Sequence, residues 1–143
     1  MEKKATILTV EDNEPDFCLL KKALKNLKNV DLEIINILNG QDALDFVYKR
    51  GIFAKSSTPD IIILDLDLPL VSGYEVLDDL KSHQIHRTIP IIIFSTSENS
   101  CDIQTCYKMH ANSYITKSFN TKKLFKKIAS LGEYWLETNK LPT

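Results

Sequence analysis

Five short runs of apolar residues recur along the chain, and longer, more polar segments separate them. Each run has the length of one β-strand, and most are rich in isoleucine, valine and leucine, as is typical of strands covered on both faces. The pattern therefore predicts five strands. They are ATILTV (5–10), LEIINI (32–37), IIIL (61–64), IIIF (91–94) and SYI (113–115).

The segments between and after these runs carry residues three or four positions apart, which is the spacing of one helix face. Turn and capping residues favour helix starts near Pro15, Asn39-Gly40 and Ser72-Gly73. Alternating strands and helices predict an α/β fold of the doubly wound class, in which a parallel sheet lies between two helix layers. The helical positions are Phe17, Leu20, Leu24 and Leu27; Ala43 and Val47; Val76, Leu77 and Leu80; Ile103, Cys106 and His110; and Leu124, Ile128, Leu131 and Trp135.

The composition is that of one globular domain: 143 residues, of which 43% are hydrophobic, so we expect residues 1–143 to form a single domain. Eighteen basic and 19 acidic residues give a net charge of −1, which provides no general attraction for nucleic acid or an anionic membrane. The three cysteines are odd in number and widely spaced, which suits a reducing compartment. With no recognisable signal peptide or membrane span, we expect a cytoplasmic protein without nucleic-acid or membrane partners.

Polar residues follow four of the five predicted strands. The carboxyl ends of parallel strands meet at one edge of a doubly wound sheet, so these side chains should converge. Crowded carboxylates repel one another, and together they form an oxygen-ligand site suited to Mg²⁺. The residues are Glu11 and Asp12 after the first strand, Asp65 and Asp67 after the third, Ser95, Thr96 and Ser97 after the fourth, and Lys117 after the fifth.

Asp65 is the best candidate for a nucleophile in this group. It ends a buried strand and should be held rigidly, whereas Glu11 and Asp12 lie on a loop where they can bind the ion. Lys117 and the hydroxyl of Ser95 add the positive charge and the hydrogen-bond donor that a transferred phosphoryl group needs. The alternative is that Asp12 or Asp65 merely caps a helix.

The motifs at these positions resemble those of the receiver domains of two-component response regulators. They are TVEDN, ILDLDLP, FSTS and YITKS, and they occur in the order found in that family. The spacing also fits, with 53 residues from Asp12 to Asp65, 30 more to Ser95 and 22 more to Lys117. The resemblance covers almost the whole chain and implies a flavodoxin-like fold, in which five helices flank a five-stranded parallel sheet of order 2-1-3-4-5.

The resemblance also implies a role for each polar residue at the strand ends. A receiver of this kind takes a phosphoryl group from a histidine kinase or a phosphotransfer protein, and it catalyses only its own phosphorylation and dephosphorylation. The implied assignments are Asp65 as phosphoacceptor; Glu11, Asp12, Asp65 and the backbone carbonyl of Asp67 as Mg²⁺ ligands; Ser95 as switch hydroxyl; Lys117 as the ammonium that pairs with the phosphoryl group; and Tyr114 as the aromatic switch residue.

A closer likeness is to the single-domain regulators associated with bacterial and cyanobacterial phytochromes. It is carried by VEDNEPD, by STS after the fourth strand, by ANSYITK near the fifth, and by a last helix extended through EYWLETNKLP. This likeness implies a light-regulated, phytochrome-type histidine kinase as partner. It also implies a homodimer through the fourth helix, the fifth strand and the fifth helix.

One position departs from the family pattern. Receivers usually follow the lysine with a proline joined by a cis peptide bond, and Ser118 stands there in this chain. A cis bond before a residue other than proline costs about 2.5–4 kcal/mol. The Lys117–Ser118 peptide is therefore either a strained cis bond or a trans bond that places the lysine differently.

Two other functions are compatible with parts of the pattern. The stretch IIILDLDLP also reads as the strand and Asp-x-Asp motif of a haloacid-dehalogenase-type phosphatase, although an acidic pair precedes it and Pro69 replaces the usual Thr or Val. A receiver-like interaction module that works without phosphorylation is the second alternative. It would bind no Mg²⁺ at millimolar concentration.

Overall fold

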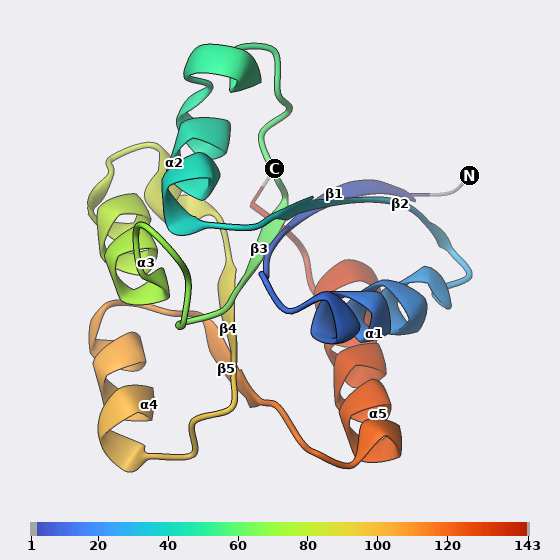
Figure 1. The fold of residues 1–143 in the computed structure, drawn as a ribbon. Coiled ribbons are helices and arrows are strands. Elements are labelled where there is room, and N and C mark those ends of the chain that lie inside the picture. Colours follow the sequence, from blue (N-terminus) through green and yellow to red (C-terminus); the bar gives the residue numbers. More distant parts are fainter. Residues whose placement is uncertain (1–2, 143) are drawn as a thin grey trace.

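The computed structural model describes residues 3–142, and five parallel strands form one sheet with helices on both faces (Figure 1). The strand order is β2-β1-β3-β4-β5, which confirms the predicted order. The sheet edges are therefore β2 and β5. The strands are β1 (Lys3–Val10), β2 (Val30–Ile37), β3 (Ile61–Leu64), β4 (Ile91–Ser95) and β5 (Ser113–Thr116).

Five α-helices connect and follow the strands, with α1 and α5 on one face of the sheet and α2, α3 and α4 on the other (Figure 1). An asparagine or serine side chain caps the amino end of each, including Asn39 and Ser72 at the predicted helix starts. The helices are α1 (Glu14–Lys25), α2 (Gly40–Tyr48), α3 (Gly73–Ser82), α4 (Ser100–Lys108) and α5 (Thr121–Gly132), with short 3₁₀ turns at Gly51–Phe53 and His86–Thr88.

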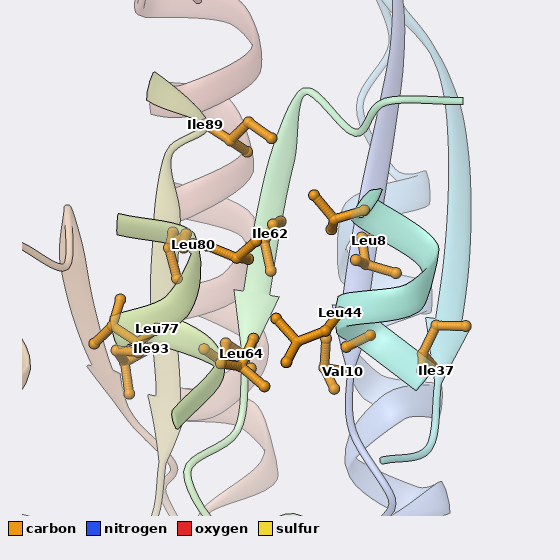
Figure 2. Packing of buried hydrophobic residues seen from close by; sticks show 14 of the residues in the cluster. Leu8, Val10, Ile37, Leu44, Ile62, Leu64, Leu77, Leu80, Ile89 and Ile93 are labelled. Carbon is orange, nitrogen blue, oxygen red and sulfur yellow. The ribbon is translucent and has the colours of Figure 1, made fainter. Parts of the chain in front are cut away.

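The central strands are buried on both faces because their side chains alternate between two hydrophobic clusters. Ile62 and Leu64 of β3 face the cluster under α2, α3 and α4, where Leu44, Leu77 and Leu80 meet them (Figure 2). Their neighbours Ile61 and Ile63 face the cluster under α1 and α5. This alternation explains the unbroken run of isoleucines and fixes the position of the residue that follows Leu64.

The end of the last helix differs from the prediction. After α5 the chain continues through a π-helical turn, Glu133–Thr138, and then leaves the helix with Asn139 in an extended conformation. The helix therefore extends through EYWLET but not through NKLP. A proline disfavours helical conformation at the residue before it, and Pro142 follows Leu141 here. Trp135 and Leu141 pack against the α1–α5 cluster, so this extension adds to the core.

Lys81 joins the end of α3 to the start of β4 and β5. Its ammonium donates to the carbonyls of Arg87 and Ile89, each at 3.0 Å, and to Asn112 Oδ1 at 2.8 Å. The same Asn112 oxygen accepts from the N–H of Ile91 at 2.9 Å. These contacts hold the entry of the strand that ends at Ser95.

We expect Lys81→Met to lower the free energy of unfolding by about 2 kcal/mol, because three acceptors lose a charged donor while the aliphatic stem is kept. Urea denaturation would measure this change. Lys108→Met, on an exposed position of α4, is the matched control and should change stability by less than about 0.5 kcal/mol. An equal effect of the two substitutions would mean that the ammonium of Lys81 does not hold this junction.

Candidate functional site

The predicted site residues converge at the carboxyl edge of the sheet. Glu11 follows β1, Asp65 follows β3, Ser95 ends β4 and Lys117 follows β5. The main-chain hydrogen bonding between the strands continues into the site. The N–H of Asp65 donates to Val10 O at 3.1 Å, and the N–H of Lys117 donates to Ser95 O at 2.7 Å. The backbone of the site is therefore as well fixed as the strands themselves.

The ammonium of Lys117 lies at the centre of the carboxylates. Its Nζ atom is 2.7 Å from Glu11 Oε1, 2.9 Å from Asp16 Oδ2 and 3.4 Å from Asp65 Oδ2. Only 7% of the side chain is exposed. Burial alone would lower the pKa of Lys117, but bonds and charges from Glu11, Asp16 and Asp65 outweigh it, so the pKa is raised and the lysine stays charged.

Glu11 is a buried residue that a main-chain amide and a side-chain amide hold in place. Its Oε2 atom accepts from the N–H of Asn13 at 3.2 Å, and its own carbonyl accepts from Asn36 Nδ2 at 3.1 Å. The residue is 2% exposed. Burial, opposed by Lys117 and reinforced by nearby Asp65, raises the pKa of Glu11 to about 8. A further cation beside this side chain would offset the cost of keeping it charged.

The acidic residues fit a divalent cation. Oxygen atoms of Glu11, Asp12 and Asp65 lie within 4.8 Å of one another, and among residues 3–142 this is the only cluster of at least three potential ligands within that limit. Asp12 is exposed, whereas the other two are buried. A set of carboxylate oxygens open to solvent on one side suits Mg²⁺ or Mn²⁺, which keep water molecules among their ligands.

Asp65 is held by a tight loop that leads into α3. Its Oδ1 atom accepts from the N–H of Asp67 at 3.3 Å, and 6% of the residue is exposed. The loop folds back so closely that a Cβ atom on Gly73 would lie 2.0 Å from the carbonyl oxygen of Asp65. The carboxylate is thus fixed both by the strand before it and by the helix start after it.

Ser95 and Tyr114 both contact the loop between β4 and α4. Ser95 is 2% exposed, and its Oγ atom accepts from the N–H of Ser97 at 3.1 Å. The hydroxyl of the half-buried Tyr114 donates to the carbonyl of Ser97 at 2.9 Å. Ser97 therefore links the two residues for which the sequence predicts a switch role.

No peptide bond among the described residues is cis, so the Lys117–Ser118 bond is trans. The Lys117 ammonium nevertheless reaches the carboxylates, because the hydrogen bond from the Lys117 N–H to Ser95 O fixes its backbone. This bond precedes Ser118, the residue that replaces the usual proline. The hydroxyl of Ser118 accepts from the N–H of Asn120, the capping residue of α5. The serine thus takes part in the turn that begins this helix.

Asp16 and Asn36 are parts of this site that sequence reasoning missed. Asp16 lies in the first turn of α1, where its Oδ2 atom is 2.9 Å from Lys117 Nζ, and no spacing in the sequence indicates this contact. Asn36 lies near the end of β2, where its amide bonds both Thr9 Oγ1 and the carbonyl of Glu11. A polar residue inside an apolar strand was the available signal.

The comparison with protein families distinguishes the receiver interpretation of the IIILDLDLP motif from the phosphatase interpretation. Residues 7–129 match the family described as response regulator receiver domain. The chain belongs to the receiver domain family of response regulators. The family match assigns IIILDLDLP to the receiver motif instead of the phosphatase motif.

This receiver is similar to regulators associated with phytochromes. The response regulator Rcp1 of Synechocystis sp. is 39% identical over 136 residues, which cover 95% of this chain and 92% of Rcp1. The phosphorylated cyanobacterial phytochrome response regulator RcpA has a TM-score of 0.94 at 39% identity, covering 98% of this chain and 99% of that one. The Mn²⁺-bound form of Rcp1 gives a TM-score of 0.94 at 38% identity, covering 97% and 99%.

These likenesses establish a receiver that works in two-component signalling, and together with the acidic cluster they support a divalent ion. They do not depend on a shared fold alone, because the matched residues span nearly the full length of both regulators. In residues 3–142, no helix has the length and apolar character needed to cross a membrane.

Proposed function

We propose that this receiver accepts a phosphoryl group from a histidine kinase onto Asp65, with Mg²⁺ as the ion. The observation that carries the proposal is the position of Asp65. Its carboxylate is buried, lies 3.4 Å from the Lys117 ammonium and shares an oxygen cluster with Glu11 and Asp12. A rigid carboxylate among fixed charges can attack phosphorus without reorganising its surroundings.

The chemical step moves one phosphoryl group between two side chains. A carboxylate oxygen of Asp65 forms a bond to phosphorus while the bond from phosphorus to the kinase histidine nitrogen breaks, and the histidine leaves as imidazole. Glu11, Asp12, Asp65 and the carbonyl of Asp67 are the residues that would hold Mg²⁺, which when bound neutralises charge on the phosphoryl oxygens.

The other site residues stabilise the product in this proposal. Lys117 keeps its charge because of its carboxylate neighbours and pairs with a phosphoryl oxygen. Ser95 turns its hydroxyl from the Ser97 N–H toward the phosphoryl group, and Tyr114 follows through its bond to the same loop. The changed loop alters the surface formed by α4, β5 and α5.

The partners follow from the regulators to which this chain is similar. A phytochrome-type histidine kinase is the proposed donor, either directly or through a phosphotransfer protein. The edge strand β5, with Tyr107 and Tyr134 about half exposed nearby, favours a homodimer through α4, β5 and α5. We further propose one domain over residues 1–143, a cytoplasmic location, no nucleic-acid or membrane partner, and no substrate turned over besides its own phosphoryl group.

The decisive experiment is the intact mass of the purified protein after incubation with acetyl phosphate and Mg²⁺. We expect the mass of one phosphoryl group to be added, and to be absent in Asp65→Asn and in a metal-chelated sample. A folded wild-type chain that gains no mass, while a known receiver is labelled in parallel, would contradict the proposal. Failure to bind Mg²⁺ at millimolar concentration would then favour a module that works without phosphorylation.

The metal ligands can be tested without any phosphoryl donor. We expect Glu11→Gln and Asp12→Asn each to weaken Mg²⁺ binding by about tenfold or more, because a neutral amide replaces one charged ligand. Isothermal titration calorimetry would measure the affinity. Glu14→Gln, an exposed acid in the first turn of α1, is the control with the same charge change. Equal losses in all three would indicate a diffuse ion atmosphere without specific ligands.

A further inference from the structure

Ser97, which lies in the loop between β4 and α4, has a fully engaged hydroxyl. Its Oγ atom donates to Asp102 Oδ2 at 2.6 Å and accepts from the N–H of Asn99 at 3.2 Å. Asp102 belongs to the first turn of α4. A short bond to a carboxylate is stronger than one between neutral groups, so Asp102 anchors the middle of this loop to the helix.

Asp102 also has a partner on a second helix. The bond from Ser97 and the nearby hydroxyl of Tyr74 hold the pKa of Asp102 below its usual value. Tyr74 is the second residue of α3, directly after the loop that begins at Asp65. The Asp102 carboxylate therefore lies between α3, the helix that follows Asp65, and the loop that follows Ser95.

The anchored residue touches both predicted switch residues through its main chain. The N–H of Ser97 donates to Ser95 Oγ, and the carbonyl of Ser97 accepts from the Tyr114 hydroxyl. Ser95 lies next to the strand that bears Asp65, since Leu64 pairs with Ile93 in the ladder. Any shift of the Ser95 hydroxyl toward Asp65 must therefore lengthen or break a bond whose other end is held by Asp102.

We propose that Asp102 is a positioning residue that, by holding Ser97, sets the geometry of the Ser95 hydroxyl and so the lifetime of the phosphoryl group on Asp65. The proposal rests on the proposed function and adds a residue outside the acidic cluster. The phosphoryl group is lost when water adds to phosphorus, the Asp65 carboxylate leaves and orthophosphate is released. A loosened loop resists the shift of the Ser95 hydroxyl toward the phosphoryl group less, so the phosphorylated state is better stabilised and this loss becomes slower.

Four variants test the anchor. Asp102→Ala and Ser97→Ala each remove one partner of the 2.6 Å bond, Asp102→Asn keeps an acceptor oxygen, and Glu98→Ala removes an exposed negative charge from the same loop as a control. We expect Asp102→Ala and Ser97→Ala to lengthen the lifetime by about fivefold, which is the scale of one such bond. Asp102→Asn should keep a lifetime close to that of the wild type, and Glu98→Ala should leave it unchanged.

The double variant Ser97→Ala/Asp102→Ala separates the anchor from general loss of stability. If the two side chains act through one bond, the double variant should lose phosphoryl groups no more slowly than either single variant. The proposal would be overturned if the change in lifetime of the double variant were the product of the two single changes. It would also be overturned if Asp102→Ala had the same lifetime as Glu98→Ala. Thermal unfolding of each variant identifies any that fails to fold.

A second readout needs no phosphoryl group. In the unphosphorylated protein, NMR signals of the Tyr114 ring and the Ser97 amide should shift or broaden in Asp102→Ala and return toward the wild-type position in Asp102→Asn. Unchanged signals in Asp102→Ala would overturn the anchor itself. A wild-type chain that accepts no phosphoryl group would overturn the proposed function and the lifetime claim, while these signals would still decide whether Asp102 holds Ser97.

Discussion

Gly73→Ala should reduce the free energy of unfolding by about 3 kcal/mol, the upper part of the range for overpacked sites, and should also abolish phosphoryl acceptance. A Cβ atom at this position would lie 2.0 Å from the carbonyl oxygen of Asp65 and 2.6 Å from Leu66 Cα. Both neighbours are backbone atoms, so no side chain can rotate away to make room. The chain must instead move the residue that carries the proposed chemistry.

Urea denaturation and intact mass after treatment with acetyl phosphate would measure the two effects. Gly132→Ala is the control, because its nearest neighbour is the flexible end of Leu24 at 3.0 Å and it lies in a helix that favours alanine. We expect that variant to keep its stability within about 1 kcal/mol and to accept phosphoryl groups normally. Normal labelling of Gly73→Ala would mean that the loop can relax without moving Asp65.

Lys117→Met should change metal binding and phosphoryl transfer in opposite directions. The ammonium lies 2.7 Å from Glu11 Oε1 and competes with a divalent ion for that carboxylate. Its loss should strengthen Mg²⁺ binding by about tenfold, since one nearby positive charge no longer repels the ion. Phosphoryl acceptance should nevertheless slow by about 100-fold, because the product loses a fixed charge-assisted donor.

Calorimetric titration with Mg²⁺ and the time course of labelling by acetyl phosphate would test both parts. Mg²⁺ should also raise the melting temperature of Lys117→Met more than that of the wild type, since the buried carboxylates have lost their counterion. Lys123→Met, on an exposed position of α5, should match the wild type in every measurement. Weaker Mg²⁺ binding by Lys117→Met would show that the lysine supports the metal site instead of competing with it.

The sequence was sufficient to predict the sheet and the residues at its carboxyl edge. Buried parallel strands appear as short apolar runs, and their ends must meet, so Asp65, Ser95 and Lys117 could be brought together without coordinates. The end of the last helix was harder to predict. The apolar positions around Trp135 suit a helix that continues, whereas the chain turns away at Asn139.

The contacts of Asp16 and Asp102 could not be predicted, because each residue acts through a side-chain contact across elements. Whether a carboxylate in a first helical turn reaches a lysine or a serine depends on how the helix rotates against the sheet. That rotation results from the packing of both hydrophobic clusters together. Likewise, only coordinates could decide that the Lys117–Ser118 peptide is trans.

The charge balance around Lys117 has a consequence for the rate of encounter with phosphodonors. The Lys117 ammonium contacts three acidic side chains, Glu11, Asp16 and Asp65, and Asp12 lies close to two of them, so the edge of the sheet has a surplus of acidic groups. Before a divalent ion binds, a small anionic donor is repelled by that surplus over roughly 10 Å at 0.1 M ionic strength. A kinase that presents its phosphohistidine within a docked complex overcomes this repulsion through contacts elsewhere, so the electrostatic field of the site disfavours free metabolite donors relative to a protein partner.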